Sequence, residues 1–401
     1  MNLISAPRPD DPRLARNGSF PVGVRALSLS DPNRIDLSLS ATEPVRGPRA
    51  LRSELWYPAA PGTASGGTYR TLLRDGVTPI TLQGHAMREA TPSADGPFPL
   101  VIISHGYPGN RFLMAHFAEH LASHGYTVVA ADHPQSTYDD QGPFGATLYH
   151  RPLDQAFLLR HLASDARFAP LVDARRSAVI GYSMGGYGAL VFGGAGISAE
   201  TVTSEVAPPH GLLAEHRAGS ADHARLTDPR LRAIIAIGPW GMGRGVWDED
   251  GLAGLQVPLM VMAGSADTIS DYAAMRRIVS GASHVPRHLL TFENAGHNAA
   301  APIPAPAESH AFSDRLGWYP FEHYADAVWD SLRMNAIARH FALAFLAQHL
   351  GGDPAQASLL NIPDTRPQET PKPAAPWPGF GTKDTPPPAG LRFESHAAQP
   401  R

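Results

Sequence analysis

The chain has 401 residues, of which 43% are hydrophobic and 17% are charged, so it holds enough apolar surface to build a folded core. Its 33 Lys and Arg residues against 37 Asp and Glu residues leave a formal charge of -4. This balance lacks the basic excess with which nucleic-acid binders neutralise phosphates, so we expect no nucleic-acid partner. The absence of cysteine excludes disulfides, thiolate nucleophiles and cysteine-ligated metals.

No apolar run approaches the roughly 20 residues of a membrane span. The first residues include Pro7, Pro9 and Pro12 and lack the apolar region of a signal peptide. We therefore expect a cytoplasmic protein without a membrane partner. The sequence does not indicate an oligomeric state.

The predicted core elements are short apolar runs that alternate with segments of helical period. An early strand is expected at residues 52–57, where polar and apolar residues alternate, and it should lie antiparallel near the edge of a sheet. Continuous apolar runs indicate strands buried on both faces of a parallel sheet, and they lie at residues 100–103, 127–131, 178–180, 233–237, 259–262 and 289–292. Helices are expected at residues 112–123, 153–163, 184–192, 272–280 and 331–349. The alternation predicts an α/β fold with a doubly wound, mostly parallel sheet.

Several segments do not fit this alternation within the expected main domain, residues 1–350. Residues 58–96, 194–229 and 298–326 are long and turn-rich, and we expect inserted loops or a lid there. Residues 351–401 form a Pro-rich C-terminal extension that includes Trp377, Phe380, Leu391 and Phe393. A wholly disordered tail has no need of these apolar side chains, so we expect the extension to dock in part on the main domain.

A G-x-S-x-G pattern centred on Ser183 spans residues 181–185, between a predicted strand and a predicted helix. Such a pattern can arise by chance in a chain with 38 glycines. Its strand–turn–helix setting favours the alternative, a sharp turn that presents the serine hydroxyl at the carboxyl edge of the sheet. We therefore predict that Ser183 is a nucleophile.

A nucleophilic serine needs a general base and a group that orients the base. Asp267 follows the strand predicted at residues 259–262, and His297 follows the strand predicted at residues 289–292. Parallel strands would bring both side chains to the edge where Ser183 lies, in the chain order Ser, acid, His. Asp267 could instead serve as a turn or cap residue, and His297 as a solvated loop histidine. We predict a catalytic triad of Ser183, Asp267 and His297.

Three other carboxylates are rivals for the acid. Asp248 and Asp250 precede their strand, and Glu293 is too close in sequence to His297 to reach the far ring nitrogen easily. Asp267 is therefore the preferred candidate.

Acyl transfer also needs N–H donors for the oxyanion. Met184 follows the nucleophile at the start of a predicted helix and should supply one backbone N–H. The loop at residues 104–109 follows a strand and should supply the other through Tyr107, because Pro108 has no N–H. That loop could also be no more than a tight turn. We interpret His105 as a structural residue that braces it.

These motifs together resemble the α/β-hydrolase superfamily over about residues 51–350. More narrowly, they resemble the dienelactone-hydrolase-like and platelet-activating-factor-acetylhydrolase-like serine esterases. Ser183 stands where true dienelactone hydrolases have cysteine, so the resemblance does not imply a dienelactone substrate. The tyrosine and methionine at the two oxyanion positions also resemble the arrangement in cutinase-like polyesterases.

The residues and the resemblance predict a serine hydrolase that cleaves small-molecule carboxylic esters through an acyl-enzyme. Hydrophobic or aromatic esters are the expected substrates, and no cofactor is expected. An amidase, lactonase, peptidase or acyltransferase with the same triad is an alternative, as is a hydrolase of polyesters or phthalate diesters. A binding or scaffold protein on this fold would lack a member of the triad.

Two tryptophans are candidates for the substrate pocket. Trp240 lies just past the strand predicted at residues 233–237, and Trp318 lies in the segment 298–326 that follows His297. That segment also carries Phe312, Tyr319, Phe321 and Tyr324, and an apolar cluster of this kind can serve packing instead.

The sequence does not predict a metal site. Asp132, His133, His284 and His288 lie in pairs, and none of them has a further ligand at a recognised spacing.

Overall fold

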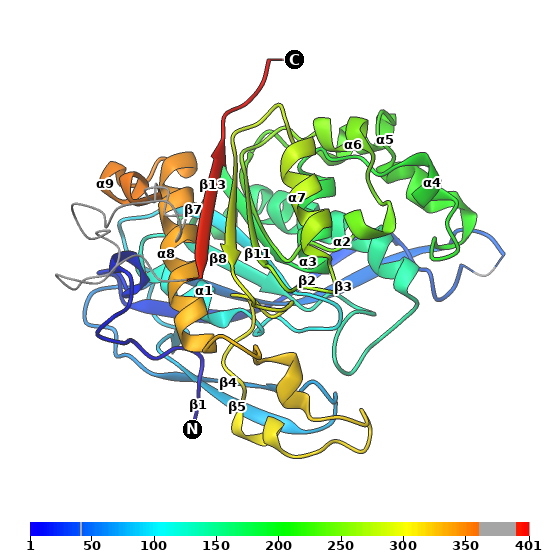
Figure 1. Cartoon of the computed structure of the whole chain (residues 1–401). Coiled ribbons are helices and arrows are strands. Elements are labelled where there is room, and N and C mark those ends of the chain that lie inside the picture. Colours follow the sequence, from blue (N-terminus) through cyan, green and yellow to red (C-terminus); the bar gives the residue numbers. More distant parts are fainter. Residues whose placement is uncertain (41, 361–389, 401) are drawn as a thin grey trace.

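Ten strands form one sheet in the part of the chain that the structure describes. The structure is a computed structural model in which residues 1–40, 42–360 and 390–400 are described. The strand order is β13-β12-β11-β10-β9-β7-β8-β3-β2-β6. Figure 1 shows the sheet in the middle of the molecule with helices on both sides. Six strands run parallel: β7 (Phe98–Ser104), β8 (Thr127–Ala131), β9 (Val172–Tyr182), β10 (Leu231–Ile237), β11 (Leu259–Gly264) and β12 (Arg287–Phe292). This arrangement confirms the predicted mostly parallel α/β sheet.

Successive residues of the central strands pack on opposite faces of the sheet, as the pleat requires. In β7, Val101 and Ile103 join the apolar core that includes α1 (Ala115–Ser123) and α8 (Ser331–Leu350). Leu100 and Ile102 join the core on the other face, with α2 (Phe144–Ser164), α3 (Met184–Phe192), α6 (Glu249–Ala253) and α7 (Tyr272–Gly281). Both faces are covered, which is why these strands read as continuous apolar runs.

Helix α2 begins earlier than the sequence predicts. The expected start at residue 153 follows Pro152, a residue that disfavours helix interiors. The helix nevertheless begins at Phe144 and keeps Pro152 inside it. Tertiary packing therefore overrides a local signal here, because thirteen of the helix's other residues are buried.

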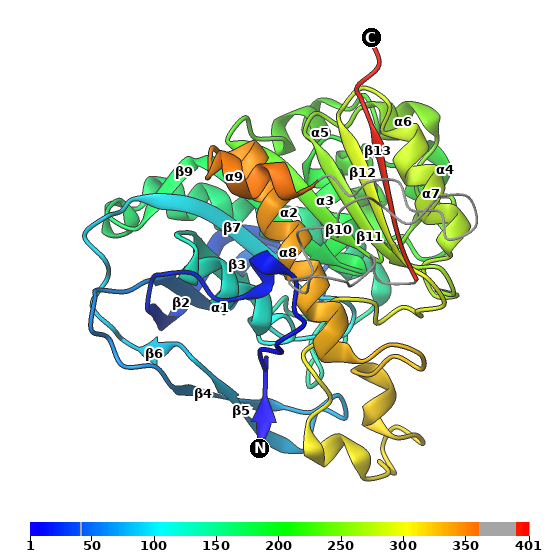
Figure 2. The same ribbon diagram turned by 60° about the vertical axis from the view of Figure 1, so that its left-hand side comes forward.

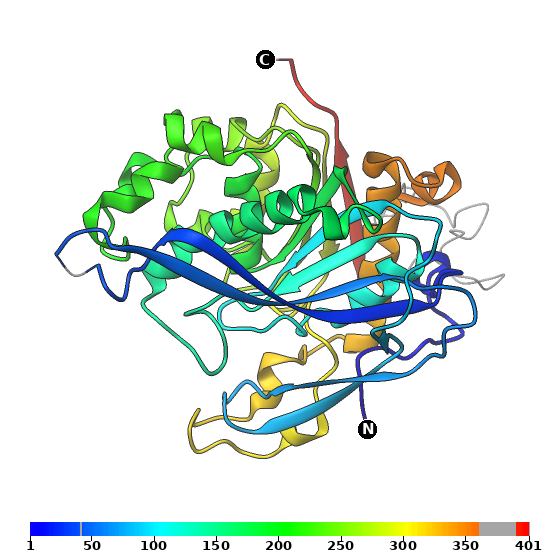
Figure 3. The same cartoon turned by 180° about the vertical axis from the view of Figure 1, so that it is seen from behind.

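The N-terminal third adds antiparallel strands to the sheet. Strand β3 (Arg46–Pro58) contains the predicted strand 52–57 and pairs antiparallel with β8. It also pairs with β2 (Val22–Ile35), a long strand that the sequence analysis did not predict. Figure 3 shows this blue pair crossing the molecule. Beyond it, the short β6 (Met87–Arg88) ends the sheet.

The segment 58–96 is not a loop insertion, which corrects the expectation from sequence. Its strands β4 (Gly67–Leu72) and β5 (Pro79–Gly84) form a hairpin, and β1 (Asn2–Leu3) pairs with β5 to complete a second sheet. Figure 2 shows this sheet lying apart from the main one. Its strands escaped prediction because each has only six residues and the segment is rich in turn residues.

The other two expected insertions contain only short helical turns. Residues 194–229 include α4 (Ala199–Val202), a 3₁₀ segment (Pro209–His216) and α5 (Ala221–Leu226). Residues 298–326 include 3₁₀ turns at Ala307–His310 and Pro320–His323. In Figure 1 this yellow segment lies beside β4 and β5.

The C-terminal extension begins with α9 (Pro354–Ala357) and returns to the sheet as β13 (Leu391–His396). Strand β13 pairs antiparallel with β12 at the sheet edge, and Leu391 is buried. Trp377 and Phe380, to which the sequence analysis also gave docking roles, lie outside the described residues. None of the described helices combines the length and the apolar character that crossing a bilayer requires.

Candidate active site

Ser183 lies in a sharp turn between β9 and α3, with φ 51° and ψ -110°. A non-glycine residue rarely adopts a positive φ, and such strain persists only where the surroundings hold it. Glycine is required on both sides: a Cβ on Gly181 would lie 2.2 Å from the carbonyl oxygen of Gly185, and one on Gly185 would lie 1.9 Å from that of Ser104. The G-x-S-x-G spacing thus permits the turn, which leaves Ser183 7% exposed.

Asp267 and His297 lie in the turns that follow β11 and β12. The Asp267 Oδ1 atom accepts hydrogen bonds from the backbone N–H groups of Ile269 (2.8 Å) and Ser270 (2.9 Å). The two turns are joined by a hydrogen bond from the Ala266 N–H to the Ala295 carbonyl oxygen (2.9 Å). These hydrogen bonds therefore fix the Asp267 carboxylate independently of its contact with His297.

The three predicted triad residues form one hydrogen-bonded chain. His297 Nδ1 lies 2.8 Å from Asp267 Oδ2, and His297 Nε2 lies 3.0 Å from Ser183 Oγ. The Tyr182 ring packs against the imidazole with 5.2 Å between ring centroids. The Asp267 side chain is 1% exposed and that of His297 is 17% exposed. The orienting carboxylate is thus buried while the base reaches the cavity described below.

The rival acids have other partners. Asp248 caps α6 by accepting the Gly251 N–H at 2.7 Å, and Glu293 forms an ion pair with Arg392 at 2.8 Å. Asp250 lies in the first turn of α6.

The two residues predicted as oxyanion donors border the same cavity as the nucleophile. Met184 is the first residue of α3, where a backbone N–H has no partner within the helix. Tyr107 and Met184 both line the cavity into which Ser183 opens. The Tyr107 hydroxyl donates to the Gly142 carbonyl oxygen at 3.0 Å, which anchors the Tyr107 side chain.

A buried arginine of α2 supports the loop that carries Tyr107, and sequence reasoning missed it. The Arg151 guanidinium group donates to the carbonyl oxygens of His105 and Gly106 and to the Ser136 hydroxyl. His105 packs against this network, as its predicted structural role requires: its ring is buried and its Nε2 atom accepts the His133 N–H at 3.2 Å. No local pattern marks Arg151, because its partners lie 15 to 46 residues away.

A second Ser–His–Asp chain lies behind that loop. Ser104 Oγ lies 2.9 Å from His133 Nε2, and His133 Nδ1 lies 3.0 Å from Asp154 Oδ2. All three residues are buried, and burial lowers the pKa of His133 to about 4. Ion pairs from Arg34 and Arg49 hold the pKa of Asp154 well below its ordinary value against the opposing effect of burial. The position of this chain makes it a support for the loop.

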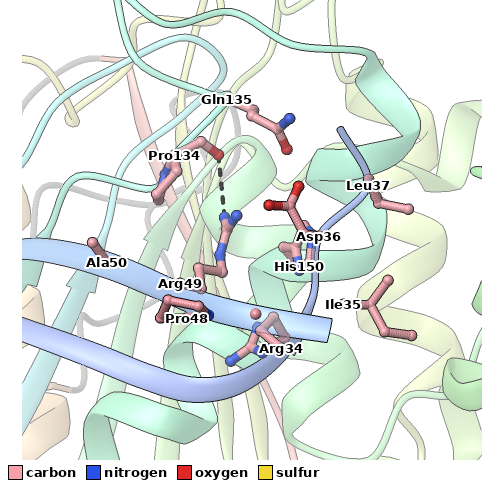
Figure 4. A pocket seen from close by; sticks show the side chains of 11 residues that line it. Arg34, Ile35, Asp36, Leu37, Pro48, Arg49, Ala50, Pro134, Gln135 and His150 are labelled. Atoms are coloured by element: carbon pink, nitrogen blue, oxygen red, sulfur yellow. Dashed lines mark hydrogen bonds between the residues drawn. The ribbon is translucent and has the colours of Figure 1, made fainter. Parts of the chain in front are cut away.

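The guanidinium groups of Arg34 and Arg49 also wall a small cavity of about 250 Å³ at the edge of β2 and β3 (Figure 4). There Arg49 donates to the Pro134 carbonyl oxygen at 3.1 Å. Since both arginines are paired with Asp154, this cavity belongs to the support behind the loop.

Ser183 opens into a cavity of about 760 Å³. Trp240 and Trp318, the two tryptophans predicted for the pocket, both line it. Phe144, which sequence reasoning missed, joins them: its ring lies 5.0 Å from the Trp240 ring and 5.4 Å from the Tyr107 ring, centroid to centroid. Of the other aromatic residues in segment 298–326, Phe312, Tyr319 and Phe321 are exposed and Tyr324 is buried.

No cluster of three or more His, Asp or Glu residues suited to a metal ion occurs among the described residues. Asp132 forms an ion pair with Arg111, and His288 Nδ1 lies 2.8 Å from the Ser395 hydroxyl. His284 Nδ1 lies 3.2 Å from the Gln399 carbonyl oxygen.

Comparison with known proteins finds similarity to ester hydrolases over part of the chain. A family model described as PET hydrolase-like matches residues 80–207, a span that includes Tyr107 and Ser183 but ends before Asp267 and His297. The chain is 27% identical over 229 residues to cutinase est1 of Thermobifida alba, which is 57% of this chain and 60% of that protein. It is 25% identical over 209 residues to the bis(hydroxyethyl) terephthalate hydrolase of Streptomyces coelicolor, 52% of this chain and 53% of that protein. The chain thus spans about half to three-fifths of these relatives.

A solved ferulic acid esterase from Streptomyces cinnamoneus superposes with a TM-score of 0.62 at 22% identity. The match covers 91% of this chain and 97% of that chain, and it shows the α/β-hydrolase fold. The cutinase relatives agree with the resemblance to cutinase-like polyesterases, whereas the dienelactone-hydrolase-like subgroup stays a prediction.

Proposed function

We propose that this chain, which belongs to the α/β-hydrolase superfamily, is a serine hydrolase that cleaves carboxylic esters through an acyl-enzyme. The observation that carries the proposal is the hydrogen-bonded chain Asp267–His297–Ser183 beside a cavity lined by aromatic side chains. The cutinase and terephthalate ester hydrolase relatives support ester hydrolysis.

In the acylation step, Ser183 Oγ attacks the ester carbonyl carbon while His297 Nε2 takes the hydroxyl proton. Asp267 accepts the Nδ1–H of His297, which keeps Nε2 free to act as the base and stabilises the imidazolium that forms. The negative charge moves to the former carbonyl oxygen, where the N–H groups of Tyr107 and Met184 receive it. His297 then gives the proton to the leaving alcohol as the ester C–O bond breaks.

In the deacylation step, a water molecule attacks the acyl carbon on Ser183 and gives a proton to His297. The new tetrahedral species collapses, the carboxylic acid leaves and the proton returns to Ser183 Oγ. One ester and one water thus give one acid and one alcohol, and no cofactor enters the cycle.

The cavity favours hydrophobic or aromatic esters. Phe144, Trp240 and Trp318 supply broad apolar surfaces, and sites of this kind bury most of a ligand against such side chains. Hydrolysis of a polyester is the second candidate, which the PET hydrolase-like match and the cutinase relatives favour.

The test is covalent labelling combined with a substrate panel. A fluorophosphonate probe should label the wild type and leave Ser183→Ala unlabelled, because the probe traps an activated serine. The wild type should hydrolyse p-nitrophenyl esters and a terephthalate diester faster than aryl amides of the same shape. Labelling that persists in Ser183→Ala would contradict the assignment of the nucleophile. Release of acid from a polyester film, compared with release from the soluble diester, decides between the two candidates.

A further inference from the structure

An arginine from outside the main sheet reaches the candidate active site. Arg74 lies in the turn between β4 and β5, and it lines the same cavity as Ser183 and His297. The hairpin that carries it lies beside the segment 298–326 in Figures 1 and 2. The two are joined at the chain's N-terminal end, where Asn2 beside β5 exchanges hydrogen bonds with Ala307 and Glu308.

The guanidinium group of Arg74 has no carboxylate partner among the described residues. No ion pair or hydrogen bond joins it to any of them, and its one ring contact is with Trp318, 5.6 Å from the ring centroid. The adjacent Asp75 is committed to its own turn, where it accepts hydrogen bonds from the backbone and hydroxyl groups of Thr78 and from the Val77 N–H. The half-buried cation of Arg74 is therefore uncompensated.

Three tyrosine hydroxyls influence the charge of Arg74. Burial lowers the pKa of Arg74, and among the described residues the hydroxyls of Tyr138, Tyr324 and Tyr107 oppose this effect. His323 also lines the cavity, and burial together with the Arg74 charge lowers the pKa of this histidine to about 3. His323 thus carries no charge near neutral pH and does not compete with Arg74 for an anion.

One carboxylate, that of Glu322, lies among the residues that line the cavity. It is exposed and stands beyond ion-pair distance of Arg74. The negative charge of Glu322 should weaken the binding of any anion in the cavity. Arg74 and Glu322 therefore have opposite effects on anion binding.

We propose that Arg74 binds a carboxylate on the substrate, remote from the bond that is cleaved, so that the enzyme accepts half-esters of dicarboxylic acids. A planar guanidinium group held over an aromatic ring is suited to a carboxylate, because its N–H groups match both oxygens. An unpaired cation in a partly desolvated cavity attracts an anion more strongly than a solvated one does. The aromatic lining suits a ring between the ester and the carboxylate, as in a terephthalate half-ester.

The inference rests on the proposed function, and it also indicates which reaction precedes the one at Ser183. A half-ester with a free carboxylate is what remains when one bond of a dicarboxylic diester is hydrolysed. The reaction that supplies this substrate is therefore the hydrolysis of a diester, and the reaction at Ser183 completes it to the free diacid and an alcohol.

The experiment compares kcat/KM within matched pairs of substrates. One pair is monomethyl terephthalate against dimethyl terephthalate, with the charge on the acyl side. The other is 4-acetoxybenzoate against 4-acetoxybenzamide, with the charge on the alcohol side. In Arg74→Gln, the ratio of charged to neutral substrate should fall about 10- to 100-fold in the terephthalate pair, whose charged member is a half-ester, and this is the range expected for a lost charged hydrogen bond. The fall should be larger in this pair than in the acetoxybenzoate pair. Arg74→Lys should retain part of the ratio.

Two further variants test whether the effect comes from direct contact between Arg74 and the substrate carboxylate or from the overall charge of the protein. Arg315→Gln removes an exposed arginine that does not line the cavity, and it should keep the wild-type ratio. Glu322→Gln removes the opposing charge and should raise the ratio. An unchanged ratio in Arg74→Gln for the terephthalate pair would overturn the assignment, and so would an equal loss in Arg315→Gln. A wild type that hydrolyses neither these substrates nor p-nitrophenyl esters would overturn the proposed function itself.

Inhibition of the wild type tests the same point without relying on the folding of Arg74→Gln. Terephthalate should inhibit the hydrolysis of p-nitrophenyl acetate competitively and at least about tenfold more strongly than neutral terephthalamide. The difference should increase in Glu322→Gln. Equal inhibition by the two compounds would overturn the proposal.

Discussion

Arg151 donates a hydrogen bond to the carbonyl oxygen of His105, in the loop that carries the Tyr107 N–H. A second bond runs from Arg151 to the Gly106 carbonyl oxygen at 3.4 Å, so one buried side chain holds both residues that precede Tyr107. Donors to an oxyanion are effective because they are fixed before charge develops. Arg151 is thus a positioning residue for the proposed oxyanion hole.

Replacing Arg151 should lower turnover more than substrate binding. In Arg151→Gln we expect kcat for a p-nitrophenyl ester to fall about 10- to 100-fold, somewhat less than the loss of an oxyanion donor, while KM changes little. Arg160→Gln on the same helix is the matched control, since Arg160 donates to carbonyl oxygens of Arg225 and Leu226 instead. Arg151→Lys should recover part of kcat. A lower melting temperature with unchanged kcat would show a purely structural role.

Asp267→Asn should keep the fold and lose most of the activity. The amide oxygen can keep accepting the N–H groups of Ile269 and Ser270, which turns the amide NH₂ toward His297 Nδ1. That contact favours the tautomer with the proton on Nε2, so the base is blocked, and kcat should fall by a factor on the order of 10⁴. The measurement is steady-state kinetics on the ester that the wild type hydrolyses best. Asp248→Asn is the control, and a comparable loss there would contradict the triad assignment.

The aromatic wall should set selectivity among esters. Trp240→Ala or Trp318→Ala should lower kcat/KM for long-chain or aromatic esters relative to acetate esters, because both rings line the cavity. Phe312→Ala is a control from the same segment, since that ring is 53% exposed and lies outside the cavity lining. A uniform loss across all esters, together with a lower melting temperature, would mean that the tryptophans serve packing alone.

Stability should decline when the pH falls below about 6.5, the ordinary histidine pKa. Burial lowers the pKa of His116 and His323 to about 3 and those of His133, His216 and His340 to about 4. Between about pH 6.5 and 4 the unfolded chain therefore binds protons that the folded chain does not, and the free energy of unfolding falls with pH. The urea midpoint measured at pH 7, 6 and 5 should decrease at each step.

The variant His216→Gln tests how much one buried histidine contributes to the pH dependence of stability. His216 donates through Nε2 to the Tyr149 carbonyl oxygen at 2.8 Å, a bond that the amide of Gln can replace. His216→Gln should weaken the dependence of the urea midpoint on pH, whereas His310→Gln, at an exposed site, should leave it unchanged. Equal slopes in the wild type and His216→Gln would contradict this linkage.

The parallel core was predictable because its signals are local. Strands buried on both faces read as continuous apolar runs, and the bounds of β8 and α3 agree with the sequence to the residue. The N-terminal β2 and the β4–β5 hairpin were not predicted. Their strands are partly exposed, so their hydrophobic pattern is weak, and the partners that stabilise them lie elsewhere in the chain.

By itself, the sequence determined where three candidate side chains leave the sheet. Each of the three, Ser183, Asp267 and His297, lies in a turn that follows a strand. The carboxyl ends of parallel strands lie at the same edge of a sheet, so these side chains are brought to one edge. Only the tertiary structure decided that Arg151 supports the Tyr107 loop and that Arg74 enters the cavity. Both contacts join segments distant in sequence, and they depend on how helices and a hairpin pack against the sheet, which no local pattern of residues specifies.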